Sequence, residues 1–204
     1  TYILKSKYVF RAWFNHTKDR ALQTLYQSPD ELLELYKYLN FDFEQQAGLQ
    51  ASVPFKAGRW LDSRLTLIGM WMRQKDSDFY DLPCHRLLGI TVLNNTFTLS
   101  RKPDLRLTVD GRLQGSAIQG IYDIPTCGDL SATFRYTFLG GNAVLTVWCR
   151  DILETSMPCP QIRYEHQWVT NSYSSFRSVG LSFAWKCGGY KEKKREAVDT
   201  SRFK

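Results

Sequence analysis

The stretch that decides the fold is LNFDFEQQAGLQASVPF, which runs from Leu39 to Phe55. Its odd-numbered residues are apolar apart from Gln45, and its even-numbered residues are polar, glycine or proline. Successive side chains of a β-strand point to opposite faces, so these residues predict one strand with an apolar and a polar face. Strands of globular proteins usually contain ~5–6 residues. The length of this strand is therefore unusual for a soluble sheet.

The same alternation recurs along the chain. It is regular over residues 61–71, 105–114, 129–138 and 178–187, and less regular over residues 8–15, 87–99, 143–150 and 161–169. Short connections rich in Gly, Pro, Asn and Asp at residues 56–58, 101–104 and 139–142 favour tight turns between neighbouring strands. We therefore predict an all-β fold, an antiparallel up-and-down meander of about 9–10 long strands. It would form a partial or small transmembrane β-barrel.

One short segment has a helical pattern. Ser28 and Pro29 are followed by Asp30 and Glu31, which matches a capping box with proline at the first helical position. We expect a short helix there, in the first long loop. The barrel segment is predicted over residues 1–188, and a basic C-terminal tail over residues 189–204.

Composition excludes several classes of protein. Hydrophobic residues make up 43% of the chain, charged residues 23% and aromatic residues 14%, which excludes a disordered chain. No apolar run is long enough for a membrane-spanning helix, but a spanning β-strand needs only ~9–11 residues. The net charge of +7 is concentrated near the C-terminus. Such a run of charge favours a solvated tail over a nucleic-acid site, so we expect no nucleic-acid partner.

The apolar stripe of each strand can face either lipid or a protein interior. Strand length and the charged opposite face favour lipid outside and a water-filled lumen inside. The alternative is a soluble lipocalin-like β-barrel whose apolar faces enclose a small hydrophobic ligand. The predicted lumen-facing residues are Asp42, Glu44, Gln46, Gln50, Arg106, Asp110, Arg112 and Arg135. The predicted lipid-facing residues are Leu39, Phe41, Phe43, Leu49, Leu65, Leu67, Leu105, Leu107, Val109, Phe134, Leu181 and Phe183. The predicted interfacial aromatic residues are Trp13, Tyr38, Trp60, Trp71, Trp148, Trp168 and Trp185.

Motifs for catalysis and for cofactor binding are missing from the sequence. There is no GxGxxG, Walker A, HExxH or GxSxG pattern, and the five cysteines show no zinc spacing. The adjacent Cys84 and His85 are interpreted as an incidental pair, and Asp42 with Glu44 as part of a solvated wall. We therefore expect no enzyme activity, no catalytic or metal-binding residue and no cofactor.

The C-terminal sequence carries a family resemblance. Residues 177–203, RSVGLSFAWKCGGYKEKKREAVDTSRF, resemble the end of the Bacteroidetes-type outer-membrane β-barrels of TonB-dependent receptors. Residues 8–19 and 145–153 resemble other barrel strands of that family, although Cys187 and Leu153 replace its usual aromatic residues. The resemblance implies that the chain is a C-terminal barrel portion of a nutrient transporter in the cell outer membrane, with an unknown substrate. Its implied partners are the lipid bilayer, the barrel-assembly machinery and, through an N-terminal part absent from this sequence, a plug domain and TonB.

Overall fold

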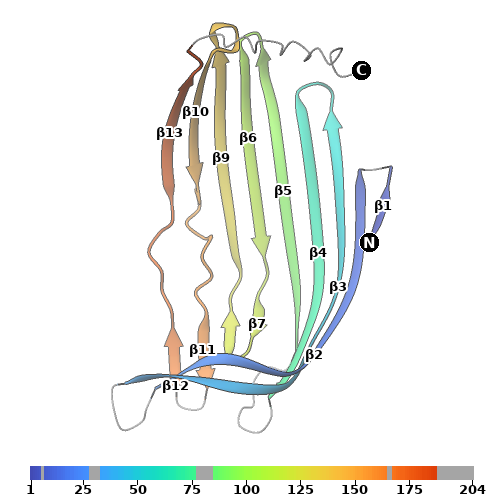
Figure 1. Ribbon diagram of the computed structural model, residues 1–204, viewed down its shortest axis with the longest axis vertical. Helices are drawn as coiled ribbons and strands as arrows, with labels where there is room; N and C mark the ends of the chain where they lie inside the picture. Colours follow the sequence, from blue (N-terminus) through green and yellow to red (C-terminus); the bar gives the residue numbers. More distant parts are fainter. Residues whose placement is uncertain (6, 28–32, 77–84, 165–166, 188–204) are drawn as a thin grey trace, which may run out of the picture.

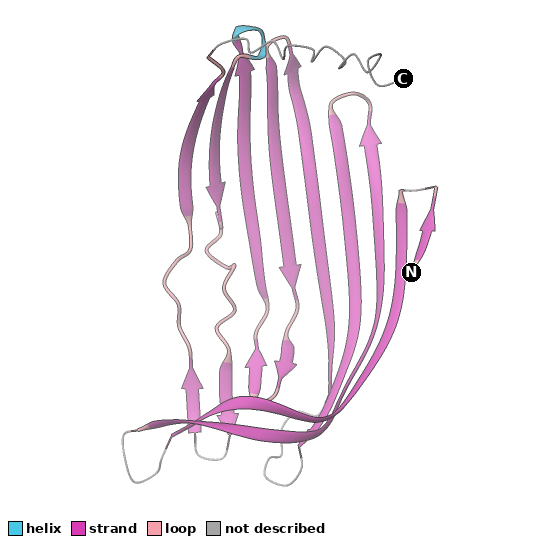
Figure 2. Cartoon of the chain, in the orientation of Figure 1, coloured by secondary structure: helices cyan, strands magenta, loops and turns pink. Residues whose placement is uncertain are grey.

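A computed structural model describes residues 1–5, 7–27, 33–76, 85–164 and 167–187 of the chain. Two antiparallel sheets make up the fold (Figures 1 and 2). The nine-stranded main sheet has the order β1-β2-β3-β4-β5-β6-β9-β10-β13. Its strands are β1 (Tyr2–Leu4), β2 (Tyr8–Gln27), β3 (Glu34–Ala57), β4 (Leu61–Asp76), β5 (His85–Arg101), β6 (Asp104–Gln114), β9 (Cys127–Phe138), β10 (Ala143–Arg150) and β13 (Ser178–Trp185). The small four-stranded sheet has the order β12-β11-β8-β7, with β7 (Ala117–Gln119), β8 (Tyr122–Ile124), β11 (Gln161–Tyr164) and β12 (Gln167–Thr170).

The meander follows the predicted alternation. The tight connections β3–β4, β5–β6 and β9–β10 lie where the sequence predicts them, at the upper end of the sheet in Figure 1. The last of them is a 3-10 turn over Leu139–Gly141, where Leu139, Gly140 and Gly141 all have positive φ. Glycine adopts this conformation without steric cost, so the turn reverses the chain within a few residues.

Cross-strand register gives the main sheet two chemically distinct faces, because directly opposed side chains lie on the same face. One row of partners runs Leu61, Phe97, Leu107, Phe134, Val147 and Leu181 across six strands. A row on the other side runs Arg64, Asn94, Asp110 and Ser131. We call the first side the apolar face and the second the polar face.

The alternation changes phase at one point in the β2–β3 hairpin. Lys18 pairs with Phe43 and Arg20 with Phe41, so Asp19 and Asp42 stand outside the ladder, and Asp19 has φ +50°. The register between β3 and β4 shifts at the same place. An inserted residue moves every following side chain to the other face. Beyond this bulge, Arg20 and Phe41 therefore share the polar face with Glu44.

Past the bulge, the hairpin turns sideways across the lower end of the sheet towards β11 and β12 (Figure 1). Phe41, Ile121 and Ile162 form a buried cluster there, and Leu22, Leu39 and Tyr122 pack against it. The hairpin end and the small sheet thus share one hydrophobic core, on the polar side of the main sheet. This core is small, and it lies outside the long, regular part of the strands.

Two sequence expectations differ from the structure. The strand predicted over residues 161–169 is wrong, because β11 and β12 form a separate hairpin in the small sheet. The ninth place in the main sheet belongs instead to β1, which pairs with the start of β2. The helix expected at Ser28 falls on residues 28–32, and the tail on residues 189–204, all outside the described residues. Among the helices of the described chain, none is long and apolar enough to cross a membrane.

Candidate functional site

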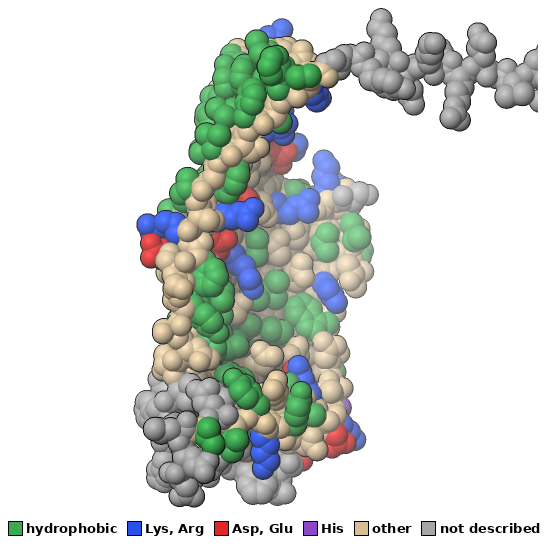
Figure 3. Space-filling model, turned by 60° about the vertical axis from the view of Figure 1, so that its left-hand side comes forward, with side chains coloured by type: hydrophobic (Ala, Val, Ile, Leu, Met, Phe, Trp, Pro, Cys, Tyr) green, Lys and Arg blue, Asp and Glu red, His purple; other side chains and the backbone are tan. Residues whose placement is uncertain are grey.

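The apolar face carries exposed and half-buried hydrophobic side chains on every strand from β2 to β13. On β13, Leu181 is 66% exposed and Trp185 is 62% exposed. Figure 3 shows such side chains covering the upper part of this edge, with charged side chains gathered below it. Water-soluble monomers rarely expose so extended an apolar surface. By register, this face carries the predicted lipid-facing residues Phe43, Leu49, Leu65, Leu67, Leu105, Leu107, Val109, Phe134, Leu181 and Phe183.

The lipid-facing prediction is wrong for Leu39 and Phe41. Phe41 is 1% exposed in the small buried core, and Leu39 packs against the same core. The physical reason is the bulge at Asp19 and Asp42, which moves both side chains to the polar side. Asp42 also departs from its predicted lumen-facing role. Its carboxylate lies 3.7 Å from the ammonium group of Lys75. Lys75 follows Gln74, which is buried on the polar face, so the Lys75 side chain points to the apolar face.

The apolar band has clear limits along β4. Its apolar-face residues from Leu61 to Trp71 are followed by Arg73 and Lys75. This stretch covers roughly 33 Å of strand at ~3.3 Å per residue, and a tilt of ~40° reduces that to roughly 25 Å of height. Trp60 precedes the band and stacks on Phe97 with 6.0 Å between ring centroids. The band therefore has the height of a bilayer core and a tryptophan near each end.

The apolar face contains one polar pair. Ser63 is 2% exposed, and its hydroxyl donates to the side-chain carbonyl of Asn95. The amide of Asn95 donates in turn to the main-chain oxygen of Val109 at 3.4 Å. Polar groups within a membrane-facing surface need such internal partners, because lipid chains provide none.

Two of the predicted interfacial tryptophans lie on the polar face instead. Trp13 pairs with Gly48, and Trp148 pairs with Gly180. In each pair, the indole ring occupies the space that a Cβ on the glycine would need. Each tryptophan thus covers a glycine of the neighbouring strand, so neither belongs to an outward-facing aromatic girdle. A tryptophan directly opposite a glycine indicates such a contact, but the sequence alone does not show which residues are opposite each other.

The other predicted interfacial aromatics have different positions. Trp71 and Trp185 lie on the apolar face, and Trp60 lies in the turn before β4. Tyr38 is 69% exposed in the hairpin beyond the bulge. The side chain of Trp168 lies outside the described part of the chain.

The polar face combines charges of both signs with amides and hydroxyls. By register it carries Glu44, Gln46, Gln50, Arg106, Asp110, Arg112 and Arg135, which are the predicted lumen-facing residues apart from Asp42. Asn94 donates to Asp110 at 2.8 Å, Arg112 donates to Gln114 at 2.7 Å, and Arg20 pairs with Glu44. Arg106 and Arg135 are direct cross-strand partners. Two like charges side by side favour a hydrated surface over a packed interior.

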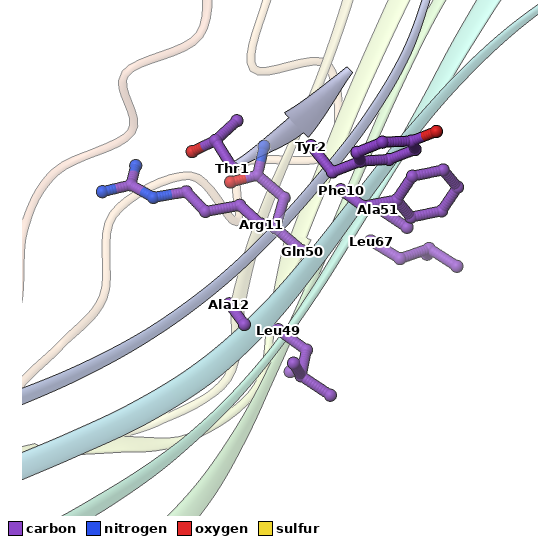
Figure 4. A pocket seen from close by; sticks show the side chains of 10 residues that line it. Thr1, Tyr2, Phe10, Arg11, Ala12, Leu49, Gln50, Ala51 and Leu67 are labelled. Carbon is purple, nitrogen blue, oxygen red and sulfur yellow. The ribbon is translucent and has the colours of Figure 1, made fainter. Parts of the chain in front are cut away.

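Figure 4 shows both faces at the edge formed by β1 and β2. The side chains of Phe10 and Leu67 project to one side of the strands, whereas Arg11 and Gln50 project to the other. Together with Thr1, Tyr2 and Gly69, these residues line an edge pocket of about 700 Å³. The pocket lies where β1 ends and β2 continues as the edge of the sheet.

The small sheet covers the lower end of the polar face. The side-chain amide of Gln74 bonds the main chain of Gly120, and Arg86 pairs with Asp123 at 3.0 Å. A cavity of about 290 Å³ remains between the two sheets, lined by Glu44, Gln46, Met70, Met72, Gln114 and Ile118 among others. Burial, with Tyr36 and Tyr173 nearby, raises the pKa of the Tyr122 hydroxyl above its ordinary value. Sequence reasoning missed this covering element entirely.

The described part of the chain contains neither a metal-binding cluster nor a disulfide bond. Within the described ranges, no cluster of three or more His, Cys, Asp or Glu side chains is placed to hold a metal ion. Cys127, Cys149, Cys159 and Cys187 are free thiols. The arrangement suits hydrogen bonding to hydrated solutes on one side and contact with apolar chains on the other.

Comparison with known proteins agrees with this two-faced wall. Residues 1–185 match the outer membrane protein beta-barrel family. No curated protein and no solved structure matches the chain. The match covers most of the chain, and the antiparallel meander with an exposed apolar face is what that family requires. The chain therefore belongs to the outer membrane protein beta-barrel family, and the protein is located in the outer membrane.

Proposed function

We propose that this chain is part of the barrel wall of a TonB-dependent transporter that takes up nutrients. In this proposal, the apolar face contacts lipid, the polar face lines the lumen, and the chain performs no catalysis. Barrel assembly depends on the cell's assembly machinery. A plug domain and TonB act through the part of the transporter that precedes this sequence. The substrate is unknown.

The observation that carries the proposal is the open, nine-stranded wall with a charged, polar face opposite an apolar band. In the sheet order, β1 and β13 are the two edge strands. A sheet edge cannot stay unpaired in a bilayer, because its N–H and C=O groups would lack partners there. In this proposal, further strands pair with these edges and complete the barrel, and a barrel larger than this wall has room for a lumen that holds a plug. The resemblance of residues 177–203 to the ends of TonB-dependent receptors adds the finer assignment.

The arrangement of the two faces does not fit the alternative of a soluble lipocalin-like barrel. A lipocalin-like barrel needs its apolar side chains around an enclosed pocket. Here the apolar face is the exposed one, and the family is one of outer membrane barrels. The charged side chains level with the apolar band lie on the opposite face, whose lower end is covered by the small sheet.

The decisive experiment measures uptake in the native host. Strains lacking the gene, lacking TonB, or lacking neither are tested for growth and uptake on a panel of scarce nutrients. We expect at least one nutrient whose uptake falls in both deletion strains. Uptake that depends on the gene but not on TonB would indicate a passive pore and would contradict the proposal.

A variant refines this test. Asp110→Asn combined with Arg112→Gln removes two charges from the polar face and should alter that uptake, whereas Leu107→Val on the apolar face should leave it unchanged. Both variants must reach the outer membrane at the wild-type level, as judged by immunoblots of the membrane fraction.

The reading frame upstream of residue 1 should also encode a plug domain.

A further inference from the structure

A row of cations lies on the apolar face, directly beyond the apolar band. His16 and Arg73 are both partners of Gln45, and Lys18 and Lys75 are both partners of Phe43. These positions continue the apolar-face rows that contain Trp71 and Ala47. We call Lys18, Arg73 and Lys75 the cationic row. The sequence alternation concealed it, because the three residues come from two strands that are far apart in the sequence.

Phe43 organises the row. The guanidinium carbon of Arg73 lies 5.3 Å from the centroid of the Phe43 ring, and the His16 ring lies 6.1 Å from it. A guanidinium over an aromatic face is held by the ring quadrupole and keeps its donors free for another partner. Lys75 lies 3.7 Å from the Asp42 carboxylate but stays 65% exposed, and Lys18 is exposed as well. The single Asp42 pair leaves a positive surplus among the three cations of the row.

The location of the row defines the chemistry of its partner. Cations placed just outside the apolar band of a membrane protein lie at the level of the lipid headgroups. Anionic headgroups attract them there, by roughly fivefold in affinity for each Lys or Arg near the surface. A phosphate offers the oxygen acceptors that a guanidinium and two ammonium groups can share.

An open space lies farther into the apolar band, beyond Trp71 and Leu87, and we call it the glycine furrow. Gly69 and Gly89 are direct partners, and a Cβ built on either would meet no atom within 4 Å. Leu49, Leu67 and Leu87 stand around these glycines and are exposed. Gly69 lies on the same face as Arg73, roughly 13 Å along the strand. A lipid whose headgroup lies on the row would pass an acyl chain over Trp71 and Leu87 and place it in this space.

We propose that the cationic row and the glycine furrow form a binding site for one phosphate-bearing, anionic lipid. Its phosphate contacts Lys18, Arg73 and Lys75, and one acyl chain lies along Gly69 and Gly89. The site goes beyond transport, since it fixes the height of the wall in the bilayer and selects the lipid around it. It rests on the apolar face contacting lipid, which is tested separately by cysteine labelling at positions 106 and 107.

The test uses the complete outer membrane protein in nanodiscs. One set contains phosphatidylcholine alone, and the other contains phosphatidylcholine with phosphatidylglycerol. Native mass spectrometry counts the phosphatidylglycerol molecules that each variant retains. The variant K18Q/R73Q/K75Q should lose retention by at least about tenfold, because three cations at about fivefold each are removed. The control R64Q/R112Q/R135Q removes the same charge from the polar face and should retain phosphatidylglycerol like the wild type.

Two further variants separate the possible outcomes. K18R/R73K/K75R keeps every charge and should retain the lipid, which distinguishes lost binding from lost folding. G69L/G89L fills the furrow and should weaken phosphatidylglycerol retention while leaving the row intact. Equal loss of phosphatidylglycerol in K18Q/R73Q/K75Q and in the control R64Q/R112Q/R135Q would show that only the overall charge matters, and it would overturn the site. Displacement of the lipid by inorganic phosphate, with no effect of filling the furrow, would show a free-anion site and overturn the lipid assignment.

Discussion

Gln74 holds the two sheets of the protein together by bonding both main-chain groups of Gly120. The Gln74 Nε2 donates to the Gly120 oxygen at 2.6 Å, and the Gly120 N–H donates to the Gln74 Oε1 at 3.0 Å. Gln74 is buried, and Gly120 has φ +60° next to Ile121 of the small core. One side chain of the main sheet thus provides hydrogen-bond partners for both main-chain groups of Gly120, in the turn between β7 and β8.

Gln74→Met should loosen the small sheet without disturbing the main one. Methionine fills a similar volume but leaves two buried main-chain groups of Gly120 without partners, at a cost of ~1–3 kcal/mol for each such group. Hydrogen exchange followed by mass spectrometry should show faster exchange in β7 and β8, with β4 and β5 unchanged. The matched control is Gln50→Met on the same polar face. Equal protection of β7 and β8 in both variants would contradict this role of Gln74.

Phe41→Ala should release the bent hairpin from the small sheet. Removing a buried phenylalanine costs ~3–5 kcal/mol, which is large for a core of this size. We expect limited proteolysis to cut the β2–β3 hairpin beyond the bulge, while the remaining strands stay protected. The control is Phe55→Ala, which removes the same group from a side chain that is 44% exposed. Identical cleavage patterns for the two variants would show that Phe41 does not anchor the hairpin.

Gly48→Ala and Gly180→Ala should destabilise the wall, because the rings of Trp13 and Trp148 occupy the space of the new methyl group. Forcing an extra carbon into such a contact costs ~1–3 kcal/mol. Gly69→Ala adds the same carbon where no atom lies within 4 Å, and it serves as the control. The measurement is the temperature at which the folded band on a detergent gel shifts to unfolded mobility. It should fall for the first two variants only.

Single cysteines at neighbouring positions should distinguish the faces. Leu107 and Arg106 are adjacent in β6, so their side chains lie on opposite faces. In a background without the native cysteines, L107C should react with a lipid-soluble maleimide added to intact outer membranes. R106C should react with a water-soluble maleimide instead. The reverse pattern would place lipid on the polar face and contradict the proposed orientation.

Alternation was sufficient to predict the wall but not what folds onto it. Leu49, Leu67 and Leu107 lie on one face as expected, because a period of two residues fixes the face wherever the ladder is regular. Phe41 shows where this reasoning ends. The pattern through Leu39, Phe41 and Phe43 continues without a break in the sequence, but the ladder skips Asp42. The only local sign is an aspartate in each strand at the bulge, a residue that tolerates irregular backbone.

The small sheet was beyond sequence reasoning for a different reason. Its strands are short, and β7 and β8 lie between the strands predicted over residues 105–114 and 129–138, where the sequence predicts no strand. Their burial comes from tertiary contacts with Phe41 and Gln74, which leave no periodic signal in the local sequence. Trp13 and Trp148 were misplaced for a similar reason, since aromatic residues near strand ends look alike whether they meet lipid or cover a glycine of the neighbouring strand.

The phase change at Asp19 and Asp42 separates two sets of design constraints within one hairpin. On one side of it, the apolar side chains belong to the band that faces the bilayer, and on the other they pack into the small buried core. The alternation of side chains between the two faces restarts at this point. The part of the hairpin beyond the bulge can therefore be lengthened, shortened or exchanged, and the side chains of the part before the bulge keep their faces. The two aspartates therefore mark a natural boundary for grafting a new loop onto this wall.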